Sequence, residues 1–244
     1  MSKPTFNLEN KVVLITGAGG IQGPEHVKLL KQAGAEVVAT DIKDTEIILD
    51  VTSQESIKKA MQTIIGQYGK IDILINNAGA TGKSSGDWNQ IIKVNLTGTY
   101  LCCQIIGAAM NPPAGGGSII NVSSVYGLVG PDFSIYESAE YAGKPMGLHP
   151  AYAASKAGVI ALTKYFASLY APRIRVNCVT PGGIFDNQAE NFVKKYSAKT
   201  MLGRMANKNE VSGALLYLAS DLSSYVTGAN IIIDGGLTAR LWND

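Results

Sequence analysis

Cysteine is scarce in this sequence of 244 residues, and its three cysteines do not have the spacing of a metal site. Cys102, Cys103 and Cys178 are flanked by apolar residues, and an odd number of thiols does not suit a disulfide framework. We therefore expect buried thiols in a reducing compartment, and no bound metal.

The sequence also lacks a strong excess of either charge. It has 19 acidic and 21 basic residues and a net charge of +2, without a dense cluster of lysine and arginine. Nucleic acids and anionic membranes are bound by such clusters. Neither partner is expected.

Long apolar runs and linkers are missing as well. No segment has the length and composition expected of a membrane span, and the N-terminal residues lack the apolar core of a signal peptide. No internal repeat, low-complexity tract or Pro/Gly/Ser-rich linker divides the chain. These absences predict a single domain over residues 1–244, located in the cytoplasm.

A glycine-rich turn lies near the start of the chain. An apolar, β-branched run over residues 11–15 is followed by Gly17, Gly20 and Gly23, and then by a helical pattern over residues 26–33. Glycines at such positions let the backbone turn tightly and approach a pyrophosphate at the N-terminus of the helix. The pattern predicts a dinucleotide site.

Asp41 follows the second predicted strand, 24 residues after Gly17. A carboxylate at this position accepts hydrogen bonds from ribose hydroxyls and repels a 2′-phosphate. Asp41 therefore favours NAD over NADP, although the nearby Lys43 leaves NADP open.

Strands and helices alternate along the whole chain, and the strands are apolar runs without polar alternation, which is typical of parallel strands covered on both faces. The pattern predicts an α/β single-domain Rossmann fold, with a doubly wound seven-stranded parallel sheet and helices on both faces. The predicted strands are 11–15, 35–40, 46–50, 71–75, 118–122, 173–179 and 230–234. The predicted helices are 26–33, 53–68, 87–110, 151–170 and 209–219. Only residues 42–45 separate the second and third strands, so the crossover helix is expected to be missing or reduced to a loop.

Tyr152 and Lys156 are four residues apart in a predicted helix and therefore share one of its faces. Tyrosine titrates near ~10 and acts as an acid or base at neutral pH only if a nearby cation favours its phenolate. We expect the Lys156 ammonium to lower the pKa of Tyr152. An isolated pair of this kind is common on protein surfaces, so other motifs in the sequence are needed to show whether this one is catalytic.

The neighbouring motifs are Thr16-Gly17, Asn76-Asn77-Ala78-Gly79, Asn95, Ser124, Tyr152-x-x-x-Lys156, Pro181-Gly182 and the terminal segment 223–236. Together and in this order, over nearly the whole chain, they resemble the short-chain dehydrogenase/reductase family. The resemblance implies an NAD(P)-dependent oxidoreductase in which Tyr152 exchanges a proton with the substrate while hydride moves to or from nicotinamide.

The resemblance also implies roles for individual residues. Ser124, rather than Ser123, would hold the reacting oxygen, Lys156 would bind the nicotinamide ribose, and Asn95 would kink its helix and seat a relay water. The implied catalytic residues are thus Asn95, Ser124, Tyr152 and Lys156. The implied NAD-binding residues are Gly17, Gly20, Ile21, Gly23, Asp41, Asp50, Val51, Asn77, Ala78, Gly79, Tyr152, Lys156, Pro181, Gly182 and Ile184.

Three features depart from the family pattern. The glycine spacing is similar to that of the family's sugar-nucleotide branch. Ser124 precedes Tyr152 by 28 residues, about twice the family's interval, so residues 131–148 form an insertion beside the active site. It either binds a sugar-like substrate through its aromatic and charged residues or forms an oligomer contact or solvent loop.

The third departure is Asp186, where the family usually has threonine. We expect it to point toward the substrate or to cap the following helix, within a lid over residues 185–205. The three departures together resemble a subgroup associated with bacterial surface-sugar and flagellin-glycan modification.

The leading hypothesis is an NAD-dependent oxidoreductase acting on a secondary alcohol or ketone of a sugar, polyol or sugar derivative. One alternative is a 3-oxoacyl-thioester or other carbonyl reductase, which would usually prefer NADPH and need basic residues after the second strand. Another is a non-catalytic NAD-binding sensor or scaffold. The resemblance implies a homotetramer or homodimer, and the apolar residues of helix 151–170 fit either an oligomer contact or the core. They are Val159, Ile160, Leu162, Phe166 and Leu169.

Overall fold

Seven parallel strands form one sheet in the order β3-β2-β1-β4-β5-β8-β9 in the computed structural model, which describes residues 6–81, 86–110, 116–141 and 143–239. The strands are β1 (Val12–Thr16), β2 (Glu36–Asp41), β3 (Ile47–Ile48), β4 (Ile73–Asn76), β5 (Gly117–Val122), β8 (Ile174–Pro181) and β9 (Asn230–Ile233). The chain builds outward from β1 to β3 and then crosses back to β4, so the strand order reverses between β1 and β4. The predicted doubly wound α/β fold is confirmed.

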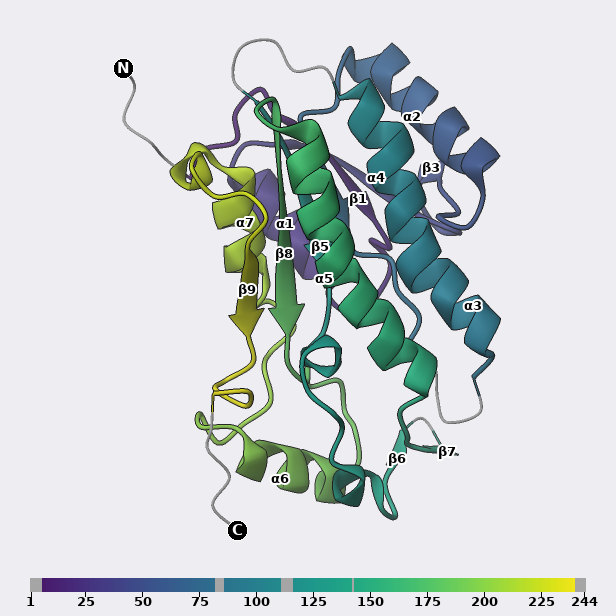
Figure 1. Cartoon of the computed structure of the whole chain (residues 1–244), viewed down its shortest axis with the longest axis vertical. Helices are drawn as coiled ribbons and strands as arrows, with labels where there is room; N and C mark the ends of the chain where they lie inside the picture. The colour runs from purple at the N-terminus through teal and green to yellow at the C-terminus, as the bar shows by residue number, and fades with distance from the viewer. Residues whose placement is uncertain (1–5, 82–85, 111–115, 142, 240–244) are drawn as a thin grey trace.

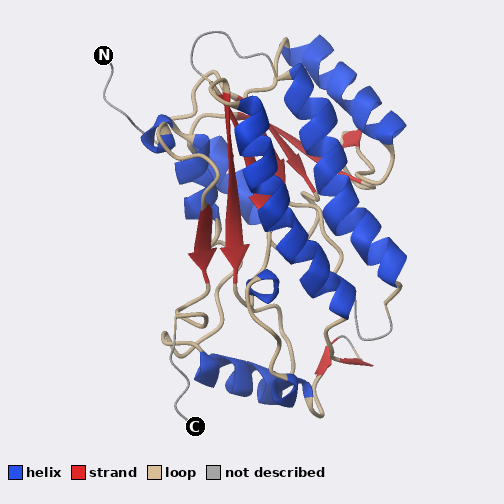
Figure 2. Cartoon of the chain, in the orientation of Figure 1, coloured by secondary structure: helices blue, strands red, loops and turns tan. Residues whose placement is uncertain are grey.

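Helices cover both faces of the sheet (Figure 2). One face carries α2 (Gln54–Tyr68), α4 (Gly98–Ala109) and α5 (Pro150–Tyr170), and the other carries α1 (Gly23–Gln32) and α7 (Ser212–Ala219). Side chains alternate along each strand to fill the two layers. Val12 and Leu14 pack toward α2, α4 and α5, whereas Val13 and Ile15 pack toward α1 and α7. This double burial explains why the strands read as unbroken apolar runs.

The link between β2 and β3 is a short loop. The chain reverses there through Asp44, which has a φ of 57°, and returns to pair two residues of β3 with Thr40 and Asp41. The described residues between these strands contain no helix. The expected loss of the crossover helix is confirmed.

Residues 88–109 form one helical rod with an irregular turn in its middle. It consists of α3 (Trp88–Ile92), a π-helical turn over Lys93–Thr97, and α4. Its 22 residues are long and apolar enough to cross a membrane, so the expectation that no segment has this length and composition is wrong. A core helix meets the same criteria, and this rod packs between α2 and α5 with half of its apolar window buried.

The insertion and the predicted lid fold against each other at the carboxyl ends of the strands, where Figure 1 shows β6, β7 and α6 beyond the arrowheads of β8 and β9. The insertion contains a 3₁₀ turn (Phe133–Tyr136) and the hairpin of β6 (Glu140–Tyr141) and β7 (Lys144–Pro145); its residue 142 lies outside the described residues. The lid contains α6 (Glu190–Lys199), the helix expected after Asp186, for which the sequence gave no bounds. A separate small core joins them, formed by Ile135, Ala139, Phe192, Tyr196 and Met205.

The three cysteines are buried and free, as expected from their apolar flanks.

Candidate active site

A cleft of about 1010 Å³ runs along the carboxyl edge of the sheet. It extends from Gly17 and Asp41, past Tyr152 and Lys156, to Phe192 and Tyr196 under the insertion and α6. Every predicted catalytic and cofactor-binding residue lines this cleft except Gly23 and Asn95. The predicted cofactor-binding residues and the predicted catalytic residues, which are far apart in the sequence, thus line one elongated site. Such a site is expected where the strand order of a parallel sheet reverses.

The turn after β1 is built from glycines that leave no room for a side chain. A Cβ on Gly17, whose φ is +65°, would lie 2.5 Å from the Cα of Ala78, and one on Gly23 would lie 2.3 Å from the carbonyl oxygen of Ala18. Asn77 closes the turn by donating from Nδ2 to the carbonyl of Gly17 over 2.8 Å. The turn therefore packs tightly between α1 and the end of β4, with its outer face open to the cleft.

Two carboxylates face the same end of the cleft. Asp41 accepts hydrogen bonds from the backbone N–H groups of Gly19, at 2.9 Å, and Ile42, at 2.7 Å. Asp50 accepts bonds from the backbone N–H and the hydroxyl of Thr52, each at 2.8 Å. Both side chains are fixed by local bonds while still lining the cleft.

Asn95 lies fully buried in the π-helical turn, at the position where the family resemblance implies a kink. Its Oδ1 accepts from the backbone N–H of Ala80 at 2.7 Å, and its Nδ2 donates to the Ala80 carbonyl at 2.9 Å and to the Ser155 hydroxyl at 3.1 Å. The amide thus ties the loop after β4 to α5. Its Oδ1 lies beside Gly79, which also neighbours the Lys156 ammonium.

The two serines at the end of β5 have different partners. Ser123 donates to the carbonyl of Lys156 at 2.7 Å and is buried in the fold. Ser124 lines the cleft beside Tyr152, where its hydroxyl acts to lower the pKa of the Tyr152 phenol, and it accepts from the backbone N–H of Tyr126. Both serines line the cleft, but the Ser123 hydroxyl already donates to a backbone carbonyl, so Ser124 is the better placed of the two to meet a molecule bound beside Tyr152.

The electrostatics of Tyr152 and Lys156 differ from the expectation. Burial raises the pKa of Tyr152, against a smaller lowering by the hydrogen bond from Ser124. The Lys156 ammonium donates to the carbonyl of Val122 at 2.8 Å and lies 5.8 Å from the centroid of the Tyr152 ring. Burial lowers the pKa of Lys156 to about 8. The expected lowering of the Tyr152 pKa by Lys156 is therefore wrong for this structure, because desolvation outweighs a cation that faces a carbonyl group.

The loop after β8 supplies Pro181, Gly182 and Ile184 to the cleft wall. Asp186 does not line the cleft: it pairs with Lys208 at 2.5 Å and hydrogen-bonds the hydroxyl of Tyr141. The N-cap of α6 is Ala189, without a side-chain hydrogen bond. Both expectations for Asp186, contact with substrate and helix capping, are therefore wrong, because a lysine and a phenol distant in sequence satisfy its charge.

The sequence analysis missed three aromatic residues at the far end of the cleft. Tyr126, Phe192 and Tyr196 line it together with Tyr136 of the insertion. Tyr196 lies on α6, and its hydroxyl accepts from the backbone N–H of Gly183 at 2.5 Å. Of these three residues, only Tyr126 could have been identified from the sequence, because it lies two residues after Ser124.

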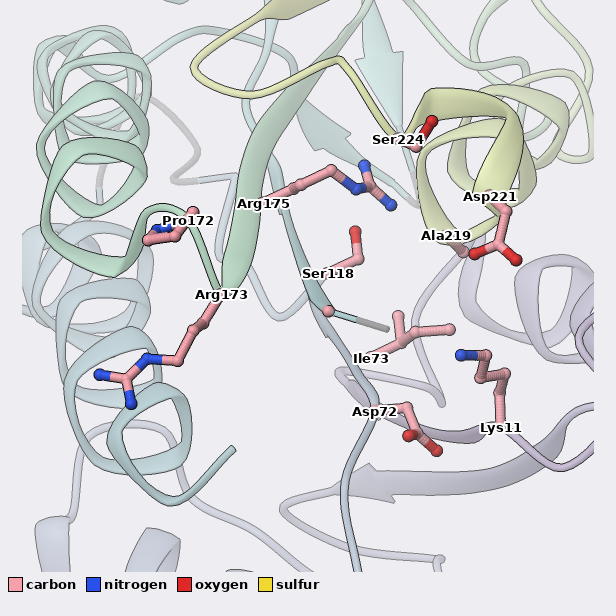
Figure 3. Close-up of a pocket in the computed structure, with 11 residues that line it drawn as sticks. Lys11, Asp72, Ile73, Ser118, Pro172, Arg173, Arg175, Ala219, Asp221 and Ser224 are labelled. Atoms are coloured by element: carbon pink, nitrogen blue, oxygen red, sulfur yellow. The ribbon is translucent and has the colours of Figure 1, made fainter. Parts of the chain in front are cut away.

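A second, smaller cavity of about 190 Å³ lies at the opposite edge of the sheet (Figure 3). The Arg175 guanidinium donates hydrogen bonds there to the carbonyls of Leu218 and Ser220. The Arg173 side chain points away from Lys11 and Asp72. This cavity holds none of the predicted site residues.

Comparison with known proteins gives consistent matches. A family model described as enoyl-(acyl carrier protein) reductase matches residues 18–238. The chain is 38% identical to a 3-oxoacyl-[acyl-carrier-protein] reductase of Thermotoga maritima, over 95% of this chain and 99% of that protein. It is 32% identical to an NAD-dependent glycerol dehydrogenase of Listeria innocua, over 96% of each chain. A short-chain dehydrogenase of Leptospira borgpetersenii, solved with bound NAD+, is 36% identical with a TM-score of 0.86, covering 98% of this chain and 97% of its own.

Proposed function

The chain belongs to the short-chain dehydrogenase/reductase family, and from this premise we propose that it transfers hydride between NAD and a secondary alcohol or ketone of a sugar, polyol or sugar derivative. One observation carries the proposal: Ser124, Tyr152 and Lys156 line one end of a cleft whose other end carries Asp41. A proton donor and a dinucleotide site thus share one cavity.

The cleft suits a dinucleotide in size and in chemistry. Glycines at 17 and 23 close the turn against Ala78 and Ala18, and the N-terminus of α1 follows at the same place. Asp41 disfavours a 2′-phosphate, and the NAD-bound Leptospira relative and the NAD-dependent Listeria enzyme support NAD. The cofactor accepts or supplies the hydride. Gly17, Gly20, Ile21, Asp50, Val51, Asn77, Ala78, Gly79, Pro181, Gly182 and Ile184 would form its binding surface.

Side chains of this protein would transfer the proton of the substrate hydroxyl. In oxidation the deprotonated Tyr152 would take the substrate's hydroxyl proton as hydride leaves the carbinol carbon, and the product would be a ketone. In reduction, Tyr152 returns a proton to the same oxygen while Ser124 holds that oxygen in place. Lys156 and Asn95 would support the site from α5 and the π-helical turn, where each is held by a backbone carbonyl.

The far end of the cleft supports a sugar-like or polyol substrate. Tyrosines at 126, 136 and 196 and Phe192 combine apolar ring faces with hydroxyl groups. Such surfaces stack on the C–H faces of a polyol and hydrogen-bond its oxygens. The relationship to a surface-sugar and flagellin-glycan subgroup stays a prediction.

A 3-oxoacyl-thioester is the second candidate substrate, because the relative that is 38% identical is a 3-oxoacyl-[acyl-carrier-protein] reductase. The acidic Asp41, in place of basic residues after β2, argues against the NADPH preference usual for that chemistry. An assay separates the two. Purified protein is given polyols and sugars with NAD+ or NADP+, and 3-oxoacyl thioesters with NADH or NADPH, while NAD(P)H absorbance is recorded. We expect the highest kcat/KM with a polyol or sugar and NAD+; a higher value with a thioester and NADPH would overturn the substrate assignment.

An oligomer is also proposed. Within helix α5, Val159 and Phe166 are buried in the core, whereas Tyr165 and Leu169 are 62% and 56% exposed. The exposed pair gives α5 an apolar outer face, which suits a contact between copies of the chain.

A further inference from the structure

Two tyrosines, brought together by the insertion, meet at the substrate end of the cleft. Tyr136, in the 3₁₀ turn of the insertion, hydrogen-bonds the hydroxyl of Tyr126 at 2.7 Å, and both residues line the cleft. Tyr126 lies in the short turn after β5, and its backbone N–H donates to the Ser124 hydroxyl at 3.3 Å. The phenol pair is thus attached to the loop that carries Ser124.

The pair is held in place by aromatic packing between the insertion and α6. The ring of Tyr136 packs on Phe192 of α6, with centroids 5.5 Å apart, and Phe192 packs on Tyr196 at 5.8 Å. Ile135, next to Tyr136, is buried in the same small core. The Tyr136 hydroxyl is therefore positioned by the packing of the insertion on the lid.

One phenolic proton of the pair remains available. A hydrogen bond between two phenols uses one of their two protons, and each oxygen can both donate and accept. Among the residues that the structure describes, the Tyr126 hydroxyl has no recorded partner besides Tyr136. Burial raises the pKa of Tyr126 and raises that of Tyr136 to about 12, so both remain protonated donors at neutral pH.

We propose that Tyr126, oriented by Tyr136, is a specificity-determining residue that donates a hydrogen bond to a second substrate oxygen beside the reacting carbon. Resting on the proposed function, this inference names the substrate class as vicinal diols and α-hydroxyketones. Ser124 and Tyr152 meet the reacting oxygen, and Tyr126, two residues after Ser124, meets the oxygen on the neighbouring carbon. A substrate without that oxygen leaves a partly buried donor without a partner, and sites built to bind a hydroxyl discriminate strongly against such analogues.

The test uses substrate pairs that differ by one hydroxyl: cyclohexanol against cis-cyclohexane-1,2-diol, and butan-2-ol against butane-2,3-diol, each oxidised with NAD+. In the wild-type protein we expect kcat/KM to be about 10-fold higher for the diols, as one hydrogen bond supplies. Tyr126→Phe should lower the diol-to-monoalcohol ratio about 10-fold, and Tyr136→Phe about 3-fold, since it disorients the donor without removing it. Tyr68→Phe, at the C-terminal end of α2 and outside the cleft, is the matched control and should leave the ratio unchanged.

The outcomes separate the two proposals. If the wild-type protein oxidises monoalcohols and diols equally well, or if Tyr126→Phe lowers kcat/KM equally for both, the role of Tyr126 is overturned while the proposed function stands. If no secondary alcohol or ketone in either series reacts with NAD(H), the proposed function fails, and the role of Tyr126 fails with it.

Discussion

The carboxylate of Asp41 lies 2.9 Å from the backbone nitrogen of Gly19 and accepts its hydrogen bond. Asp41 ends β2 and Gly19 belongs to the turn after β1, so the bond fixes a negative charge at the mouth of the cleft. A cofactor that carried a 2′-phosphate there would meet this charge at close range, whereas ribose hydroxyls would find an acceptor.

Removing that charge should weaken the discrimination between the two cofactors. Asp41→Asn keeps an oxygen for the Gly19 N–H and deletes only the charge, so we expect the ratio of kcat/KM for NAD+ over NADP+ to fall about 10-fold. Glu46→Gln, an exposed carboxylate of the same loop that does not line the cleft, is the matched control and should leave the ratio unchanged. A wild-type preference for NADP+ would contradict the assignment of NAD.

Tyr152 should be indispensable for turnover but not for cofactor binding. Tyr152→Phe keeps the ring and loses the hydroxyl that would exchange the proton with the substrate. General acid–base catalysis contributes roughly 10²–10⁴-fold, so we expect kcat to fall by at least about 100-fold in both directions while the Kd for NADH stays within about 3-fold. Steady-state rates and NADH fluorescence titration provide the two measurements. Turnover at the wild-type rate would exclude Tyr152 as the acid or base.

The direction of the Tyr152 pKa shift predicts how the two directions depend on pH. Because burial raises this pKa, the phenol is protonated at neutral pH and ready to donate in ketone reduction. Oxidation needs the deprotonated form, so its rate should rise as the pH is raised from about 7 to 9, while the reduction rate should stay level or decline. Initial rates in both directions across this range test the prediction. An oxidation rate that is flat with pH would show that bound ligands bring the pKa below neutrality.

The sequence predicted the parts of the fold and site that depend on local patterns. The apolar runs gave the strands because each is buried on both faces, and the steric demands of Gly17 and Gly23 are specific enough to be read from their spacing. A kink at Asn95 was implied by the family resemblance and supported by the poor fit of an asparagine within an apolar helix; its amide finds partners outside the helix in Ala80 and Ser155.

The missed features all depend on partners distant in sequence. Asp186 was assigned to substrate or to a helix cap, yet Lys208 and Tyr141 hold it, and no local pattern connects those three residues. The position of the Lys156 ammonium on the Val122 carbonyl likewise depends on how α5 packs on β5. Pattern and spacing specify elements, whereas side-chain partners are set by tertiary packing.

The small core between the insertion and α6 should govern substrate binding more than cofactor binding. Ile135 is 3% exposed in that core, and truncating such a residue costs about 2–5 kcal/mol locally. We expect Ile135→Ala to raise the substrate KM about 10-fold while the Kd for NADH changes less than about 2-fold. Ile232→Ala, at a site 46% exposed on β9, is the control for a general loss of packing. An equal loss of NADH affinity would mean that the insertion supports the whole cleft.

His26 should make the stability of the fold depend on pH. It is fully buried on α1, and its Nδ1 lies 2.8 Å from the hydroxyl of Ser212 on α7. Burial lowers its pKa from 6.5 to about 4. Between these two values the unfolded chain binds more protons than the folded chain, so the contribution to stability is complete above about pH 6.5 and is lost as the pH falls toward 4.

The size of this effect is measurable against a variant that does not titrate at this position. From pH 7.5 to pH 5 the wild-type protein should lose about 2 kcal/mol of unfolding free energy more than His26→Asn, whose amide can still reach Ser212. Urea unfolding of both proteins at the two pH values provides the measurement, and the remaining histidine, His149, is common to both and cancels. Equal losses in the two proteins would show that His26 is protonated in the folded state at pH 5, and that the contact between α1 and α7 tolerates the imidazolium.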